Sequence, residues 1–170
     1  MAAYSMAAHE ALGMKPQIFF IDYSGWDHHD QVLETQSAML SELDTALGEF
    51  SAAVTELGLG NQVTTFSLSE FGRTLTSNGN GTDHAWGGNV MVMGDTVKGK
   101  NIFGEYPTLA LESSIEVGNG ILIPQLSADQ YFAELALWFG VSPSDLPAIF
   151  PSLTNFFQPG SGMPIGFINS

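Results

Sequence analysis

Hydrophobic residues in the first third of the chain follow two different spacings, which predict two different elements. The run QIFFIDYS, at residues 17–24, is almost continuously apolar and rich in β-formers, as is typical of a strand buried on both faces. Over residues 31–57, apolar side chains instead recur three or four positions apart, at Met39, Leu43, Leu47, Phe50, Val54 and Leu57. This second spacing predicts an amphipathic helix that ends near Gly58 and Gly60.

A second strand-like run, QVTTFSLS at residues 62–69, follows this helix. A strand, a helix and another strand in this order are typical of a right-handed crossover between parallel strands. The sequence therefore predicts an α/β fold, with a mainly parallel sheet and flanking helices. In such a sheet, the loops at the carboxyl ends of the strands form the ligand crevice. We therefore expect the loops at residues 25–31 and 69–74 to meet across one cleft.

Two further helices are predicted outside this unit. The first covers residues 1–13 and ends at Gly13. The second lies within residues 127–141, where Ser127 is a good N-cap residue. One face of this second helix carries Tyr131, Leu135 and Trp138.

The rest of the chain predicts short or irregular elements. Residues 89–95 suit a strand, and the stretches 101–111 and 118–124 suit short strands or turns. The tail at residues 143–170 is rich in Pro and Gly and is expected to be irregular. With 170 residues, of which 44% are hydrophobic, residues 1–170 are expected to form a single α/β domain.

Composition narrows the classes of function. The formal net charge is -14, from 18 acidic against 4 basic residues, so binding to nucleic acid or to anionic membranes is not expected. The chain has no cysteine, which excludes disulfides, thiolate catalysis and Cys-ligated zinc. The first residues have no basic region, and His9 and Glu10 interrupt their apolar run, so they predict neither a signal peptide nor membrane insertion.

The histidines carry the clearest chemical signal. Three of the four lie next to an aspartate, in the groups Asp27, His28, His29, Asp30 and Asp83, His84. Imidazole and carboxylate together are ligands for zinc and similar divalent ions, and a carboxylate can also orient an imidazole that binds the metal. For any one of these residues, a helix cap or a hydrogen-bonded loop histidine is an equally good interpretation. The cap is favoured for Asp30, which stands where the long helix begins.

Other residues near these groups allow two interpretations each. Arg73 can form an exposed ion pair with Glu70, or it can bind an anion bidentately. Trp26 and Trp86 adjoin the Asp-His groups, and packing beneath the loops is favoured over lining a cleft. The glycines within residues 79–88 match neither a P-loop nor a dinucleotide-binding fingerprint and are interpreted as tight turns.

Three segments resemble one protein family. In order, they are GMKPQIFFIDYSGWDHHDQ, SEFGRTLTSNGNGTDHAWGG and DQYFAELALWFGV, and they resemble the C-terminal half of the bacterial family known as domain of unknown function 1501. The resemblance covers most of the chain. It implies similarity to sulfatases and alkaline phosphatases, a sheet that is part of an α/β/α sandwich, and a periplasmic or extracellular location reached through a twin-arginine signal.

The resemblance also implies a metal site. Asp83 and His84 match the adjacent Asp-His metal pair of the alkaline phosphatase superfamily, and Asp27 and His29 match the GWDxH element of the family. The expected ion is divalent, with zinc favoured over manganese or calcium. The superfamily usually places three residues between its other Asp and His ligands, whereas one residue separates Asp27 from His29, so the number of metal ions stays open.

The implied function is that of a metal-dependent phosphate- or sulfate-ester hydrolase-like domain acting on a small anionic ester. Arg73 would offset the negative charge that develops during the reaction. The superfamily carries its nucleophile after an N-terminal strand, so we expect the chain to be the C-terminal portion of a longer domain, lacking the nucleophile and showing little activity alone. The alternative is a non-catalytic exported binding or surface protein that retains the fold and uses the same loops for caps and turns.

Overall fold

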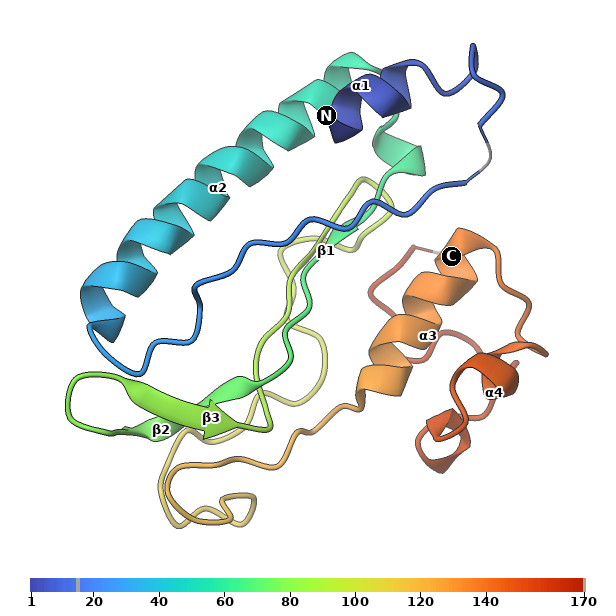
Figure 1. The fold of residues 1–170 in the computed structure, drawn as a ribbon. Helices are drawn as coiled ribbons and strands as arrows, with labels where there is room; N and C mark the ends of the chain where they lie inside the picture. Colours follow the sequence, from blue (N-terminus) through green and yellow to red (C-terminus); the bar gives the residue numbers. More distant parts are fainter. Residues whose placement is uncertain (15, 170) are drawn as a thin grey trace.

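Residues 1–14 and 16–169 are described by a computed structural model, drawn in Figure 1. The helical elements are α1 (Ala2–Ala7), α2 (Val32–Glu56), the 3-10 turn η1 (Gly60–Gln62), α3 (Ala128–Phe139), α4 (Leu146–Ile149) and the 3-10 turn η2 (Leu153–Asn155). The strands are β1 (Thr65–Phe66), β2 (Gly72–Ser77), β3 (Thr82–Ala85) and β4 (Val92–Met93).

The predicted parallel sheet is wrong. In the described residues, β1 pairs antiparallel with β4, and β2 pairs antiparallel with β3, as two separate two-stranded sheets. Residues 17–24 are extended but form no ladder with any of these strands. Strands β2 and β3 need only a short turn to pair antiparallel. The predicted parallel ladder would instead need a second strand hydrogen-bonded to residues 17–24. The α/β/α sandwich is therefore not the architecture of this structure.

The long helix is confirmed. It was predicted over residues 31–57, and α2 spans Val32–Glu56. The predicted apolar stripe is its most protected side, where Val54 is buried and the other stripe residues within the helix are half-buried. The expected cap at Asp30 does not form, because Gln31 occupies the N-cap position and the Asp30 carboxylate accepts a hydrogen bond from Asn80.

Gly48 is a point where this helix can be strengthened. It lies in the interior of α2, it is exposed, and a methyl group added there would meet no atom within 4 Å. Alanine has a higher helix propensity than glycine, so Gly48→Ala is expected to raise the free energy of unfolding by about 1 kcal/mol. Urea unfolding followed by circular dichroism measures this change, and an unchanged or lower midpoint would contradict it.

The core of the structure gathers around α3. Ser127 caps this helix in a capping box with Gln130, which confirms the predicted N-cap. Tyr131 and Leu135 are buried on one face, and Trp138 packs against the same cluster, as predicted. Phe66 of β1 and Val92 of β4 also pack there, so α3 lies against the β1–β4 sheet. A second cluster, on another side of α3, consists of Ala133, Leu146 and Leu153.

The tail contributes to this core. It contains α4 and η2 and is otherwise without helix or strand, and its Phe167 and Ile168 are buried against Tyr131 and Leu135. Ile168 also forms an isolated bridge with Val97. The tail is therefore held by side-chain packing more than by regular secondary structure.

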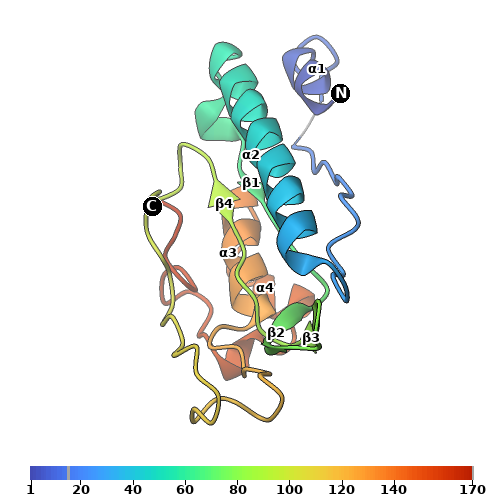
Figure 2. The same ribbon diagram turned by 90° about the vertical axis from the view of Figure 1, so that its left-hand side faces the viewer.

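The first residues form a shorter helix than predicted. α1 ends at Ala7, turns follow as far as Gly13, and α1 lies against the C-terminal part of α2 in both views (Figures 1 and 2). Of the short elements expected between residues 89 and 124, β4 and a single bridge between Glu116 and Leu122 are present. None of the helices in the described part of the chain combines the length and hydropathy needed to cross a bilayer.

Candidate metal site

The polar stretch after residue 71 folds back on itself as a hairpin. Strands β2 and β3 pair Arg73 with His84 and Ser77 with Thr82, with a register shift between the two pairs. Residues 78–81 form the turn, and Gly81 N–H donates to the Asn78 side chain at 2.8 Å. Side-chain oxygens of this kind stabilise tight turns. The stretch predicted as a loop after residue 69 is therefore largely strand, and the hairpin lies near the start of α2 (Figure 1).

The loop before α2 docks onto this hairpin through backbone hydrogen bonds. His28 C=O accepts from Thr82 N–H at 3.1 Å, and Val32 N–H donates to Asn80 C=O at 3.2 Å. The Asn78 side chain also donates to His29 C=O at 3.1 Å. These contacts join residues about fifty positions apart in the sequence and fix the side chains of the loop against β3.

Gly81 makes this docking sterically feasible. A Cβ atom built on Gly81 would lie 2.3 Å from the backbone carbon of His29 and 2.5 Å from the backbone oxygen of His28. We expect Gly81→Ala to push the loop away from the hairpin and to weaken any metal binding at the site. Gly48→Ala, which has room for its methyl group, is the control. Zinc titration of both variants measures the effect, and equal affinities would show that the loop and hairpin need not touch closely.

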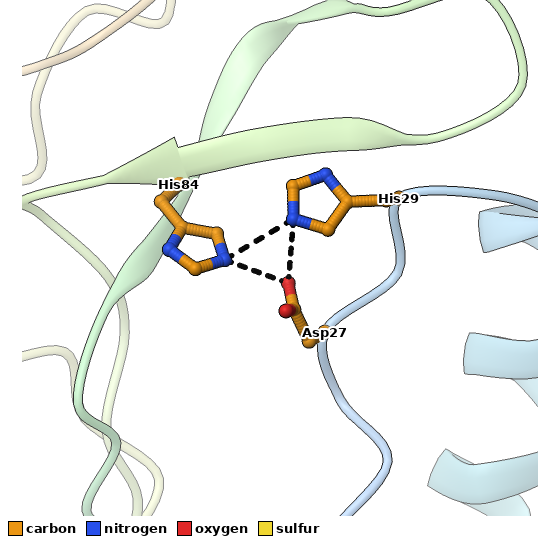
Figure 3. A group of neighbouring side chains, drawn as sticks. All are labelled: Asp27, His29 and His84. Atoms are coloured by element: carbon orange, nitrogen blue, oxygen red, sulfur yellow. Dashed lines mark hydrogen bonds and ion pairs between the residues drawn. The ribbon is translucent and has the colours of Figure 1, made fainter.

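Three side chains converge where the loop meets the hairpin (Figure 3). Asp27 Oδ1 lies 2.8 Å from His84 Nε2 and 3.1 Å from His29 Nε2, and the two imidazole nitrogens are 3.2 Å apart. The three ligand atoms all lie within 4.8 Å of one another. About half of each side chain is exposed, so the group is open to solvent on one side. The segments 25–31 and 69–74 that were expected to meet are in contact through Arg73, on a hairpin rather than at the edge of a parallel sheet.

Asp83 lies outside this group of three. Its Oδ1 is 3.2 Å from His29 Nδ1, on the opposite side of the imidazole from the Nε2 atom that faces Asp27. A carboxylate can only accept a hydrogen bond, so this contact favours a proton on His29 Nδ1, which is the tautomer that would present Nε2 to a metal. Carboxylates commonly orient metal-binding histidines in this way. In this structure, Asp83 is placed to orient His29, and its predicted role as a metal ligand stays a prediction.

Arg73 forms hydrogen bonds with the loop before α2 and none with Glu70 in the described structure. Its Nη1 donates to Asp27 Oδ1 at 2.5 Å, and its Nη2 donates to His28 C=O at 2.8 Å. The same guanidinium also donates to the side chain and the backbone oxygen of Thr82. Of the two interpretations of Arg73, the ion pair with Glu70 does not form, and Arg73 pairs with Asp27 instead. Arg73 joins the strand to the loop, and its predicted role in binding an anion stays a prediction.

The charge state of Asp27 follows from these partners. Partial desolvation of the carboxyl acts to raise its pKa, but hydrogen bonds from Arg73 and His84 act in the opposite direction and outweigh it. The net pKa of Asp27 lies below the ordinary value of 3.8. The carboxylate is therefore ionised at neutral pH, as a metal ligand must be. Its contribution to stability is present above the ordinary pKa of aspartate and is lost as the pH falls through the lowered value.

One known protein family matches a part of the chain that contains the whole site. Residues 1–131 match the family described as a protein of unknown function, DUF1501. The chain belongs to the DUF1501 family. No curated protein and no solved structure matches the chain. The resemblance seen in the sequence is confirmed at the level of this family, while similarity to sulfatases and alkaline phosphatases stays a prediction.

Sequence reasoning missed one residue of this DUF1501 site. The ring of Phe71 stacks on the ring of His84, with centroids 3.7 Å apart and planes 10° from parallel, and so limits rotation of that imidazole. No pattern in the sequence indicated this contact, because the two residues meet only when the hairpin forms. The two tryptophans differ in burial. Trp26 is half-buried and forms a T-shaped contact with the buried ring of His28, whereas Trp86 is 64% exposed.

Proposed function

We propose that this DUF1501 protein binds a zinc ion through Asp27, His29 and His84. The observation that supports the proposal is the convergence of the three ligand atoms, with separations of 2.8 to 3.2 Å. Ligand atoms about 2.0–2.2 Å from a tetrahedral zinc ion lie roughly 3.3–3.6 Å from one another, so a slight outward movement of the side chains is enough. One carboxylate and two imidazoles, with a fourth position open, are typical of catalytic zinc.

The protonation pattern also suits a metal. His84 Nε2 faces an ionised carboxylate at 2.8 Å, so in the absence of metal this nitrogen carries a proton that is donated to Asp27. A divalent cation can take the place of that proton, because it attracts the same carboxylate and both imidazole nitrogens. Arg73 pairs with Asp27 and partly balances its charge, which limits repulsion of an anionic substrate.

The reaction type we propose is hydrolysis of a small phosphate or sulfate ester, as the resemblance implies. A bound divalent ion supplies a Lewis acid for the ester oxygen. The exposed side of the cluster leaves space for a small anion beside Asp27 and His84. Within residues 1–14 and 16–169, no serine or threonine hydroxyl is hydrogen-bonded to His29 or His84, so the attacking group is not assigned. Export to the periplasm or cell exterior remains part of the proposal.

Calorimetric titration of zinc into the chelator-treated protein tests the metal site. One zinc ion per chain is the expected result for the parent protein. The double variant His29→Ala/His84→Ala is expected to lose this binding, because it removes two of the three ligands. His9→Ala is the control, since His9 lies in the turn after α1 and outside the group of ligands. Equal zinc binding by the parent and the double variant would contradict the proposal.

The hydrolase part of the proposal has a separate test. Inorganic phosphate or sulfate is expected to bind to the zinc-loaded protein and not to the metal-free protein, because the anion would contact the ion directly. The readout is the heat of phosphate or sulfate binding with and without zinc, using His9→Ala as the control for nonspecific effects. Zinc binding without any zinc-dependent anion binding would keep the metal site and refute the hydrolase assignment.

One observation supports the alternative of a non-catalytic binding or surface protein. Asp27 contacts Arg73 and both histidines directly, and these contacts by themselves join the loop to the hairpin. Under this alternative, the group fastens the loop to the hairpin and nothing more. The thermal midpoint of the metal-free protein would then stay unchanged when zinc is added, whereas a ligand that binds the folded state raises it.

A further inference from the structure

The protein exposes more surface than a compact monomer of its mass. Its solvent-accessible surface is 11223 Å², whereas a folded monomer of 18.2 kDa exposes roughly 8,100 Å². Part of the excess is apolar and continuous along the chain, at residues 18–21. Ile18, Phe20 and Ile21 are 76%, 77% and 76% exposed. Soluble monomers rarely expose contiguous apolar surface of this kind, and where it occurs it commonly marks an interaction site.

The backbone of this segment is also unpaired. Within the part of the chain that the structure describes, residues 17–24 are extended and make no backbone-to-backbone hydrogen bond. The segment runs along α2, and Figure 2 places it on one side of that helix with β1 and β4 on the other. Its end is anchored, because the Tyr23 hydroxyl donates to Glu42 at 2.8 Å. An extended segment with free N–H and C=O groups is a template for another β-strand.

The sequence of the segment indicates which strand fits. Ile18, Phe19, Phe20 and Ile21 read the same in both directions. If two copies pair antiparallel about an axis between Phe19 and Phe20, isoleucine lies opposite isoleucine and phenylalanine opposite phenylalanine. Gln17 then lies opposite Asp22 of the partner subunit, so no two like charges face each other. Cross-strand aromatic and β-branched pairs are stabilising pairs in antiparallel sheets.

The charge of this segment is compatible with pairing of two copies. Copies of a chain with a net charge of -14 repel each other over most of their surface. Residues 16–24 contain a single charged residue, Asp22, so little charge repulsion opposes the pairing of two copies along this segment. We propose that residues 17–22 pair antiparallel with the same residues of a second copy, which gives a two-fold symmetric dimer. This proposal does not depend on the metal site.

Sedimentation velocity over a range of protein concentrations tests the dimer. The parent protein is expected to be dimeric at high concentration, and the amides of residues 18–21 are expected to exchange hydrogen more slowly as the dimer fraction rises. Phe20→Lys is expected to raise the dimer dissociation constant by roughly 10-fold or more, because the two-fold axis removes the Phe19–Phe20 pair twice. The lysine also reduces the net negative charge, so added charge repulsion cannot explain the loss.

Two further variants keep the test specific. Phe20→Tyr retains an aromatic ring and is expected to leave the dimer intact. Ile102→Lys changes a residue that is 75% exposed elsewhere and is expected to leave the dimer intact too. Circular dichroism checks that each variant folds like the parent. A parent that stays monomeric with fast-exchanging amides, an open-ended assembly, or a dimer unaffected by Phe20→Lys would each overturn the proposal.

Discussion

Replacing His84 with alanine is expected to weaken zinc binding by more than about 100-fold, whereas Asp83→Asn is expected to weaken it by about 10 to 100-fold. The difference follows from geometry. His84 Nε2 is one of the three converging ligand atoms, while Asp83 contacts the far side of the His29 ring. Loss of a ligand removes a bond to the metal, but loss of the orienting carboxylate only loosens one imidazole. Zinc affinities from calorimetry or from competition with a chelator of known affinity measure both changes.

A matched control separates orientation from general charge. Glu70→Gln removes a negative charge from an exposed carboxylate that makes no hydrogen bond or ion pair in the described structure. It is expected to change zinc affinity by much less than Asp83→Asn. If Asp83→Asn weakened binding as strongly as His84→Ala, Asp83 would be a metal ligand, as the resemblance implies, and the orienting role assigned here would be wrong.

Glu134→Gln is expected to lower the free energy of unfolding by about 2–4 kcal/mol. The Glu134 side chain is fully buried in α3, and its carboxylate accepts backbone N–H groups from Ile165, Gly166 and Ile168 at 2.7, 2.6 and 2.8 Å. A glutamine keeps one accepting oxygen, but its NH₂ group meets N–H groups that also donate. At least one buried donor therefore loses its partner, and the tail that carries Phe167 and Ile168 loosens from the core.

Urea unfolding of Glu134→Gln beside Glu49→Gln measures this effect. Glu49 lies on an exposed part of α2 without a hydrogen-bond partner in the described residues, so its replacement is expected to change the free energy of unfolding by less than about 0.5 kcal/mol. A Glu134 variant as stable as the control would mean that the three N–H groups find other partners, and that the carboxylate does not hold the tail.

Local signals in the sequence predicted several elements well. The spacing of Met39, Leu43 and their neighbours located α2 to within one residue at each end, because a helix satisfies its own backbone hydrogen bonds. Ser127 was identified as a cap for the same reason, since its partner Gln130 is three residues away. Asp27, His29 and His84 were chosen from composition and resemblance, and the structure brings these three together.

Pairing of strands was not predictable in this way. The apolar run at residues 17–24 has the composition of a buried parallel strand, yet no strand of the described structure pairs with it. Whether such a run is buried depends on which other backbone reaches its hydrogen-bonding groups, and that partner is distant in the chain or on another chain. The parallel sheet was inferred from strand-like runs, from the order of the elements and from the resemblance, and none of these determines which strands pair.

The sequence by itself determined α2, α3 with its cap, the family and the residue types available to a metal. Tertiary structure decided the antiparallel hairpin, the partner of Arg73, the position of Asp83 behind His29 and the burial of Glu134. The physical reason is the range of the interactions. Helix periodicity and capping involve residues within four positions of each other, whereas each of these contacts, apart from the hairpin, joins groups that lie more than thirty positions apart.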